Sequence, residues 1–453
     1  MSKTKNVNLL EGPVLLSLTK LAIPIMATFL VQVAYNLIDM LWIGRIGSNA
    51  VAAVGAAGMY MWLSNGLAFL TKTGAQVKVG HSIGSGRIED AASYTTSALQ
   101  ICLLCSAIFG FICFFFAGPL IRFFNLTSPE VIRDAELYLM ITCGLTVFSL
   151  LNQTLTGILT ATGDSRSPFI ATSIGLVINI FLDPLMIWGF GPLPAMGVAG
   201  AGAATVIAQA IVFGILFLYI RKDTLLFPHV NLFYIPEKIY FAGVLRIGFP
   251  AAAQSMIFTS ISMIISRMVA NYGDAAIAVQ KVGAQIESIS WMTADGFAAS
   301  VNSFIAQNHG AGNTKRIKKG YYLSMMVVTI WGLFCNFLLM GFPETIFRLF
   351  ITEAPVIPMG VDYLWILGIS QVFVCLEVAT AGAFNGLDHP LPPALTGIVL
   401  TAGRIPAAML LTSTALGLNG IWWAITISSV LKGMVLVLWF VTYSKRHLRI
   451  PSK

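Results

Sequence analysis

The sequence predicts an all-α integral membrane protein, and three observations support this fold class. The chain has 453 residues, of which 57% are hydrophobic and 10% charged, and its mean hydropathy is +0.82. A soluble protein carries about 25% charged residues, so this chain has too few charges to cover a water-facing surface. Apolar stretches of span length recur along the chain, and the short alternating segments of a β-barrel are absent from the sequence. Soluble enzymes, secreted disulfide scaffolds and disordered chains are thereby excluded.

About twelve apolar stretches are long enough to cross a membrane as helices. A spanning helix needs roughly 20 mostly apolar residues, and lipid offers no partner for an unpaired backbone group. The stretches cover residues 16–43, 51–80, 95–120, 136–160, 168–190, 196–220, 240–270, 276–307, 319–345, 357–384, 392–415 and 418–443.

The positions of the basic residues predict the orientation of the chain. Twelve spans place both termini on one side, and that side receives most of the Lys and Arg residues. The other side receives only Arg45, Arg122, Arg133 and Arg348. Because cytoplasmic loops are enriched in Lys and Arg, we expect a multi-pass protein of the plasma (cell inner) membrane with both termini cytoplasmic. The net charge of +8 is therefore attributed to topology and not to nucleic-acid binding.

The two halves of the chain carry the same ordered pattern of Gly and Pro. Pro24 falls on Pro250 at a shift of 226 residues, and Pro184 falls on Pro406 at a slightly smaller shift, as loop deletions would produce. We expect two parallel six-helix repeats that pack around a pseudo-two-fold axis with a cavity between them. The expected lobes are residues 1–226 and 227–453.

Acidic residues inside predicted spans are candidates for function, because a charge at the centre of a spanning helix costs about 2.5–3.5 kcal/mol. Asp39 lies in the first span and Asp183 in the fifth. Asn179 shares a helix face with Asp183, and Pro184 leaves the carbonyl of Ile180 without its helical donor. Oxygen-rich sites suit hard cations, so we expect Na⁺ at Asp39, Asn179 and Asp183, or a proton carrier if the two carboxylates meet. The alternative for Asp39 is a solvated position near the outer interface.

The second half has no acid at the equivalent positions. The repeat places Ile265 at the position of Asp39 and Ile405 at that of Asp183. This asymmetry indicates that the Na⁺ or proton, which we expect to act as the coupling ion of a transporter, binds in the first half only.

The eighth span carries its own acids, Glu287 and Asp295. They lie eight residues apart, on about one helix face. We interpret them as residues that line the central cavity and attract cations. The alternative is an internal salt bridge with Lys281 or Arg267.

The motifs disfavour several other functions. The sequence GxxxxGK[ST] does not occur, so the chain holds no ATP-binding cassette, and no ATPase subunit is expected as a partner. The sequence shows neither a nucleophilic triad nor a metal-ligand cluster, which disfavours an enzyme. No cofactor is expected beyond the coupling ion, and nothing requires more than a single chain.

The order of these motifs resembles the multidrug and toxic compound extrusion (MATE) family along essentially the whole chain. The matching positions in the first half are Pro24, Gln32, Tyr35, Asp39, Gly47, residues 80–86 and 157–168, Asn179, Asp183, Pro184, Gly197 and Gly200. In the second half they are residues 310–313 and 385–388.

This resemblance implies two six-helix lobes that form a V-shaped interlobe cavity, and export of cationic, amphipathic drugs driven by Na⁺ or H⁺. Acids in the first and fifth spans are similar to the branch called DinF-like, whose ion site lies in the first lobe. The resemblance implies ion-coupling roles for Asp39, Asn179, Asp183, Asn152 and Thr205.

Two further positions follow from the resemblance. Pro24 matches a proline at which the first helix is reported to bend. The other branch has acids in the seventh and tenth spans, where this chain has Phe258 and Val374.

We therefore predict a cation-coupled antiporter that exports lipophilic cationic drugs or toxins by alternating access. Substrate is expected in the interlobe cavity, and the candidate contacts are Gln32, Tyr35, Glu287 and Asp295. The alternative function is a flippase for lipid-linked oligosaccharides of the same superfamily, because Arg267 and Arg404 offer positive charge for a pyrophosphate.

Overall fold

A computed structural model describes residues 7–124, 126, 128–189, 194–350 and 353–448, and every regular element in these residues is helical. The predicted all-α fold is confirmed. Long apolar sequences favour helices in a membrane protein because the helix satisfies its own backbone hydrogen bonds.

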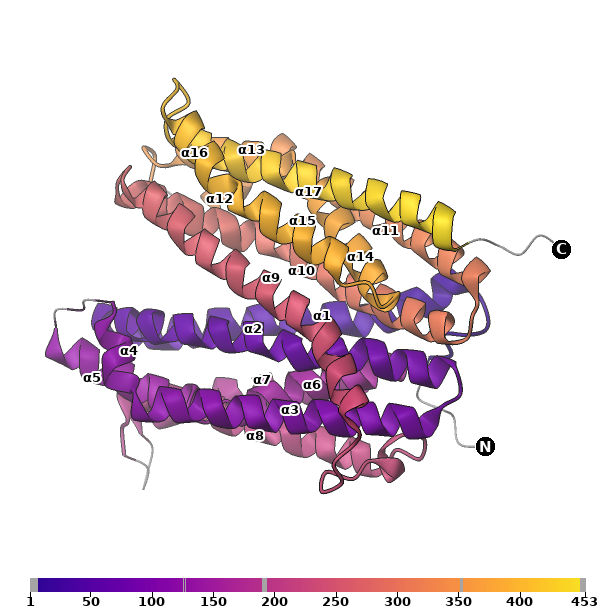
Figure 1. Cartoon of the computed structure of the whole chain (residues 1–453). Helices are drawn as coiled ribbons and strands as arrows, with labels where there is room; N and C mark the ends of the chain where they lie inside the picture. Colours follow the sequence, from indigo (N-terminus) through magenta and orange to yellow (C-terminus); the bar gives the residue numbers. More distant parts are fainter. Residues whose placement is uncertain (1–6, 125, 127, 190–193, 351–352, 449–453) are drawn as a thin grey trace. The chain divides into compact units, whose positions relative to one another are not determined.

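The first half forms eight α-helices and a short 3₁₀ turn (Figure 1). They are α1 (Val14–Ile46), α2 (Ser48–Gly84), α3 (Ile88–Phe115), α4 (Ala117–Arg122), α5 (Pro129–Thr142), α6 (Val147–Ala161), α7 (Arg166–Trp188), α8 (Gly197–Arg221) and η1 (Phe227–His229).

The second half repeats this order, with one helix divided in two. Its helices are α9 (Lys238–Ala270), α10 (Asp274–Gly310), α11 (Thr314–Gly341), α12 (Pro343–Arg348), α13 (Ile357–Gly368), α14 (Gln371–Gly386), α15 (Leu391–Ala402), α16 (Arg404–Thr412) and α17 (Leu418–His447). The lengths of the leading helices agree in pairs, with 33 residues in α1 and α9, 37 in α2 and α10, and 28 in α3 and α11.

The turns between the helices repeat as well. Gly86 and Gly312 both adopt a positive φ, of 75° and 69°, directly before α3 and α11. After α6 and α14 the residues with positive φ are Gly163 and Asp388. The turn geometry therefore places Asp388 at the position of Gly163.

Most of these helices can cross a membrane. Nine helical segments in the described residues are long and apolar enough, and the count rises to 11 if each of two bent pairs is one span. The bent pairs are α5 with α6 and α13 with α14, bent by 44° and 45°. The remaining long helix of the described chain, α10, has 37 residues but carries Lys281, Glu287 and Asp295. All twelve predicted stretches thus lie on helices, and eleven have span-like composition.

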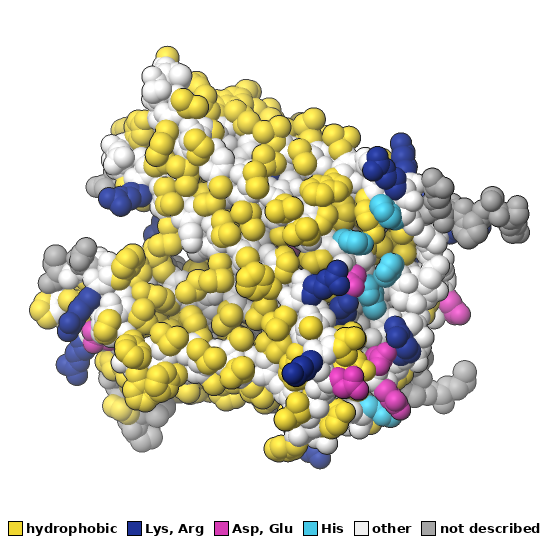
Figure 2. Space-filling model, in the orientation of Figure 1, with side chains coloured by type: hydrophobic (Ala, Val, Ile, Leu, Met, Phe, Trp, Pro, Cys, Tyr) yellow, Lys and Arg dark blue, Asp and Glu magenta, His cyan; other side chains and the backbone are white. Residues whose placement is uncertain are grey.

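The surface fits a lipid environment. Large apolar side chains such as Phe115, Phe181 and Phe337 are exposed. Figure 2 shows apolar side chains along the helices and charged side chains gathered near helix ends. Exposed apolar surface of this extent is typical of a membrane-facing protein.

The chain divides into two compact units. The first contains Met1–Val7 and Ala27–Ala252, and the second contains Asn8–Met26 and Ala253–Lys453. Helices α1 and α9 therefore each contribute to both units. The division at 226/227 stays a prediction about the sequence repeat, because the compact units change at other points of the chain.

The core of the first unit forms around α2, which packs against α3, α5 and α6, while α7 packs against α8 (Figure 1). The first part of α9 closes against this core at two glycines. A Cβ at Gly74 would meet Val244, and a Cβ at Gly248 would overlap the carbonyl oxygen of Leu70. Glycine at these positions lets two helix backbones approach closely.

The second unit packs α10 and α14 together, with α11 and α17 against α14. A buried ion pair joins two of these helices: Lys432 Nζ on α17 lies 3.0 Å from Glu377 Oε2 on α14, and neither side chain is more than 10% exposed. The structure thus explains Glu377, an acid inside a predicted span, by a basic partner.

A side chain at Gly248 should destabilise the first unit. Leu70 meets the new Cβ with backbone atoms, which have no rotamer to escape into, and overpacking costs about 1–3 kcal/mol. We expect Gly248→Ala to lower the thermal midpoint of the purified chain in detergent by several degrees. Gly214→Ala is the control, because nothing lies within 4 Å of a Cβ there. Equal midpoints for the two variants would contradict this packing.

Removal of Lys432 should be more damaging than removal of the whole ion pair. Lys432→Met leaves the Glu377 carboxylate buried without its partner, which costs about 3–5 kcal/mol. We expect a lower thermal midpoint in the single variant and recovery of most of the loss in Lys432→Met with Glu377→Gln. Lys445→Met, at the exposed end of α17, is the control. A single variant as stable as the double variant would show that the pair does not matter.

Candidate functional site

The candidate site of the first unit begins on α7. Asn179 and Asp183 are both 0% exposed, and Asn179 Nδ2 donates a hydrogen bond of 3.0 Å to Asp183 Oδ1. The spacing of four residues places both on one helix face, as predicted. Pro184 follows inside the helix, so the carbonyl of Ile180 has no helical donor from that residue.

Asp39 reaches this pair from the part of α1 that belongs to the first unit. Its carboxyl group interacts with that of Asp183 through a side-chain hydrogen bond. Such a bond needs one proton held between two carboxylates. Asp39 Oδ1 is buried, whereas the residue as a whole is half-buried. The two acids, which sequence reasoning could not place together, meet in the structure.

Helix α8 closes another side of the site. The Tyr35 hydroxyl on α1 donates a hydrogen bond of 2.9 Å to Thr205 Oγ1, and Thr205 is 7% exposed. Tyr138 on α5 is 2% exposed and lies within electrostatic range of Asp39 and Asp183. Sequence reasoning missed Tyr138, because its position in an amphipathic helix gives no sign that it faces two acids.

The charge of the site is unbalanced. No ion pair of the described residues involves Asp39 or Asp183. Three buried oxygens lack a hydrogen-bond partner in the same part of the chain: Asp39 Oδ1, Asp183 Oδ2 and Asn179 Oδ1. Two carboxylates and an amide oxygen form an all-oxygen donor set that fits a hard cation such as Na⁺, and the shared carboxyl contact equally fits a proton.

Asn152 has a different neighbour. Its Nδ2 donates to the backbone oxygen and to the side-chain Oε1 of Gln209 on α8, both at 2.9 Å. Gln209 lies one turn after Thr205 on α8. Asn152 therefore connects α6 to α8, the helix whose Thr205 accepts the hydrogen bond from Tyr35. No described contact joins Asn152 to the two acids directly. Gln32, one turn before Tyr35 on α1, is exposed.

The equivalent positions of the second unit are apolar. Ile265 is 3% exposed within the core of that unit, and Ile405 packs against the same cluster. The two units therefore differ at these positions: the first carries acids where the second has isoleucine.

Glu287 on α10 has partners that were not predicted. The Tyr363 hydroxyl donates to its carboxylate, and Arg404 lies within electrostatic range. Arg404 is 7% exposed, and its Nε and Nη2 donate to Ser428 and Ser429 at 3.2 and 3.0 Å. The alternative of a salt bridge from Glu287 to Lys281 or Arg267 is not what the structure shows.

The other predicted positions are placed as follows. Asp295, two turns further along α10, is half-buried. Pro24 lies inside α1, in the part of this helix that belongs to the second unit, and α1 continues on both sides of it to Ile46.

Comparison with known proteins agrees with this architecture. The family model MatE matches residues 24–185 and 250–410, once in each half. A probable multidrug resistance protein NorM from Thermotoga maritima is 27% identical over 433 residues, which are 94% of this chain and 92% of that protein. The FAD transporter of Shewanella oneidensis is 26% identical over 435 residues, 94% of each chain.

Solved structures share the fold. A MOP superfamily transporter from Pyrococcus furiosus superposes with a TM-score of 0.91 at 23% identity, over 99% of this chain and 100% of that chain. A multidrug resistance MATE family transporter in an outward-facing conformation gives the same TM-score at 22% identity. With the family match covering more than half of the residues in both halves, the chain belongs to the MatE family of membrane transporters.

Proposed function

We propose that this transporter is a cation-coupled antiporter that exports lipophilic cationic compounds, with Na⁺ or H⁺ bound at Asp39 and Asp183. The observation that carries the proposal is the contact between the half-buried Asp39 and the buried Asp183, neither of which has a basic partner in the described residues. An acid inside a spanning helix is costly unless a cation or a proton compensates it. A site that must exchange its compensating charge is suited to coupling.

The chemistry at the site is an exchange of positive charge. A proton bridges the two carboxyl groups, or Na⁺ takes their oxygens together with Asn179 Oδ1. Release of the cation leaves two negative charges close together, and their repulsion pushes α1 away from α7. The site thereby converts ion occupancy into a preference between two positions of α1.

The division of two helices between the units supports alternating access. α1 passes from the second unit to the first after Met26, and α9 passes from the first to the second after Ala252. Each change of unit comes two residues after a proline, Pro24 in α1 and Pro250 in α9. Proline removes a helical hydrogen bond, so these points are suited to act as hinges.

The substrate class rests on several supports. Relatives over nearly the whole chain are named as probable multidrug resistance proteins. The first unit has acids at positions 39 and 183, and the equivalent positions of the second unit are apolar, which favours the DinF-like branch. Gln32 and Tyr35 of α1, with Glu287 and Asp295 of α10, are our candidate substrate contacts. We place the protein in the plasma membrane with both termini cytoplasmic, as the distribution of Lys and Arg indicates.

The flippase alternative has less support. A flippase needs a basic group that can hold a pyrophosphate. Arg404 already donates hydrogen bonds to Ser428 and Ser429, and it interacts electrostatically with Glu287 and Glu377. One relative is named as an FAD transporter, so an anionic substrate is an outcome that transport assays should include.

Neutralisation of either acid should abolish coupled export. Asp39→Asn and Asp183→Asn keep the shape of the side chains but remove the charge that a cation compensates. A charge inside a spanning helix changes the free energy by more than about 1.4 kcal/mol, the amount that corresponds to a tenfold change in an equilibrium constant. Ethidium efflux from cells expressing either variant should therefore fall at least about tenfold. Asp362→Asn, an exposed acid that contacts Asn419, is the control. Normal efflux in both variants would disprove coupling in the first unit.

Efflux should depend on one ion gradient. In vesicles that contain the purified protein, we expect ethidium transport either to stop when Na⁺ is replaced by K⁺ at constant pH, or to stop when a protonophore collapses the pH gradient. In either case the dependence should be lost in Asp183→Asn. Transport that is insensitive to both treatments would contradict antiport.

A further inference from the structure

A basic pocket lies within the second unit. It has a volume of about 290 Å³, and it is formed by residues 12–14 together with Asn313, Lys315, Arg316 and Lys319. Gly12 and Pro13 precede α1, which begins at Val14. Asn313 precedes α11, and the three bases lie in the first two turns of that helix. We refer to it as the basic pocket.

Arg316 fixes the wall of the basic pocket. Its Nη1 donates to Gly12 O at 2.7 Å, its Nη2 to Glu11 O at 2.8 Å, and its Nε to Leu9 O at 3.1 Å. Asn308 Nδ2 also donates to Leu9 O, at 3.0 Å. These bonds hold the chain before α1 in place, so the pocket is a formed part of the structure.

Three bases line the basic pocket, and one of them, Arg316, lies within electrostatic range of the nearby acid Glu11. Lys315 and Lys319 are exposed, lie one helical turn apart and therefore share a face of α11. The lining of the pocket contains no Asp or Glu. The first turn of α11 adds the partial positive charge of a helix N-terminus. Lys315 and Lys319 have no acid in the lining beside them, so an anion is favoured there.

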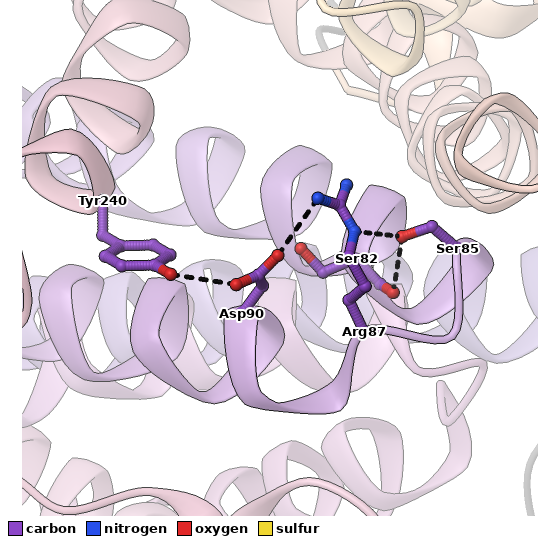
Figure 3. Close-up of polar contacts among 5 residues, drawn as sticks. All are labelled: Ser82, Ser85, Arg87, Asp90 and Tyr240. Atoms are coloured by element: carbon purple, nitrogen blue, oxygen red, sulfur yellow. Dashed lines mark hydrogen bonds and ion pairs between the residues drawn. The ribbon is translucent and has the colours of Figure 1, made fainter.

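The equivalent positions of the first unit carry an ion pair. The repeat places Arg87 at the position of Asn313, Glu89 and Asp90 at those of Lys315 and Arg316, and Tyr240 at that of Val14. There Arg87 Nη1 lies 3.2 Å from Asp90 Oδ2, and the Tyr240 hydroxyl donates to Asp90 Oδ1 at 2.9 Å (Figure 3). The first unit thus has an ion pair at these positions, whereas the charged residues that line the pocket of the second unit are all basic.

The surroundings of the basic pocket favour a lipid. Leu15 and Leu16, the next residues of α1, are 38% and 48% exposed, so apolar surface begins directly beside the pocket. A ligand with a phosphate group and acyl chains fits both features. Clusters of Lys and Arg at the cytoplasmic end of spanning helices attract anionic headgroups.

We propose that the basic pocket binds the phosphate group of an anionic phospholipid headgroup in the leaflet that faces it. Lys315 and Lys319 hold the phosphate oxygens, Arg316 fixes the pocket, and Leu15 and Leu16 contact the acyl chains. The basic pocket shares no residue with the acidic site.

The test compares lipid binding in matched charge variants of the full-length protein. Native mass spectrometry in detergent measures the affinity for phosphatidylglycerol and for phosphatidylcholine. We expect a preference for phosphatidylglycerol that falls about tenfold in Lys315→Gln with Lys319→Gln, since each Lys near an anionic headgroup contributes to affinity. Lys445→Gln with Arg446→Gln removes the same charge from exposed positions at the end of α17 and should keep the preference. Equal losses in both double variants would overturn the site.

A second arm distinguishes the source of the phosphate. Inorganic phosphate is added at constant ionic strength, with chloride as the reference anion. We expect it to displace phosphatidylglycerol only weakly, because it lacks acyl chains to contact Leu15 and Leu16. Binding of inorganic phosphate with no preference for phosphatidylglycerol over phosphatidylcholine would overturn the assignment to a lipid. Thermal midpoints of the double variants verify that both remain folded, because Arg316 and its bonds are left intact.

Discussion

The burial of two carboxyl groups in contact, Asp39 and Asp183, is the constraint on which the organisation of the first unit depends. Neither acid has a basic partner in the described residues, and a charge at this depth is costly in lipid. Helix α7 supplies the amide of Asn179, a Tyr35–Thr205 bond holds α1 against α8, and Tyr138 of α5 lies within electrostatic range of both acids. The site therefore depends on residues from four helices, and we propose that a cation or a proton completes it.

The repeat gives the two units one scaffold, and their buried charges make them different. Where the first unit has its acids, the second has Ile265 and Ile405 in an apolar cluster. The second unit instead buries Glu377 against Lys432, and it holds Arg404 with two serines close to Glu287. Each of these two acids has a base nearby, Lys432 for Glu377 and Arg404 for Glu287. A binding site for an exchangeable cation is favoured where the compensation is missing, which is the first unit.

The sequence was sufficient for the fold class and for the helix order, because the length of apolar stretches and a repeated Gly and Pro pattern are local properties. It also placed Asn179 and Asp183 on one face, since helical spacing determines that relation. It could not bring Asp39 to Asp183, because 144 positions of chain separate them and only packing decides whether they meet. Tyr138, Gln209 and Lys432 were missed for the same reason. An aromatic residue, an amide or a base in an apolar helix shows its partner only once the neighbouring helix is in place.

The shared helices offer a route by which the proposed charge change in the first unit reaches the second. Asp39 lies twelve residues after Ala27, the point where α1 enters the first unit, which corresponds to about 18 Å along a helix axis. The equivalent position on α9, twelve residues after Ala253, is Ile265. Both helices join the units, but only α1 carries a group whose charge a cation can change. Coupling in this protein would therefore act through α1, while α9 follows as the second connection between the units.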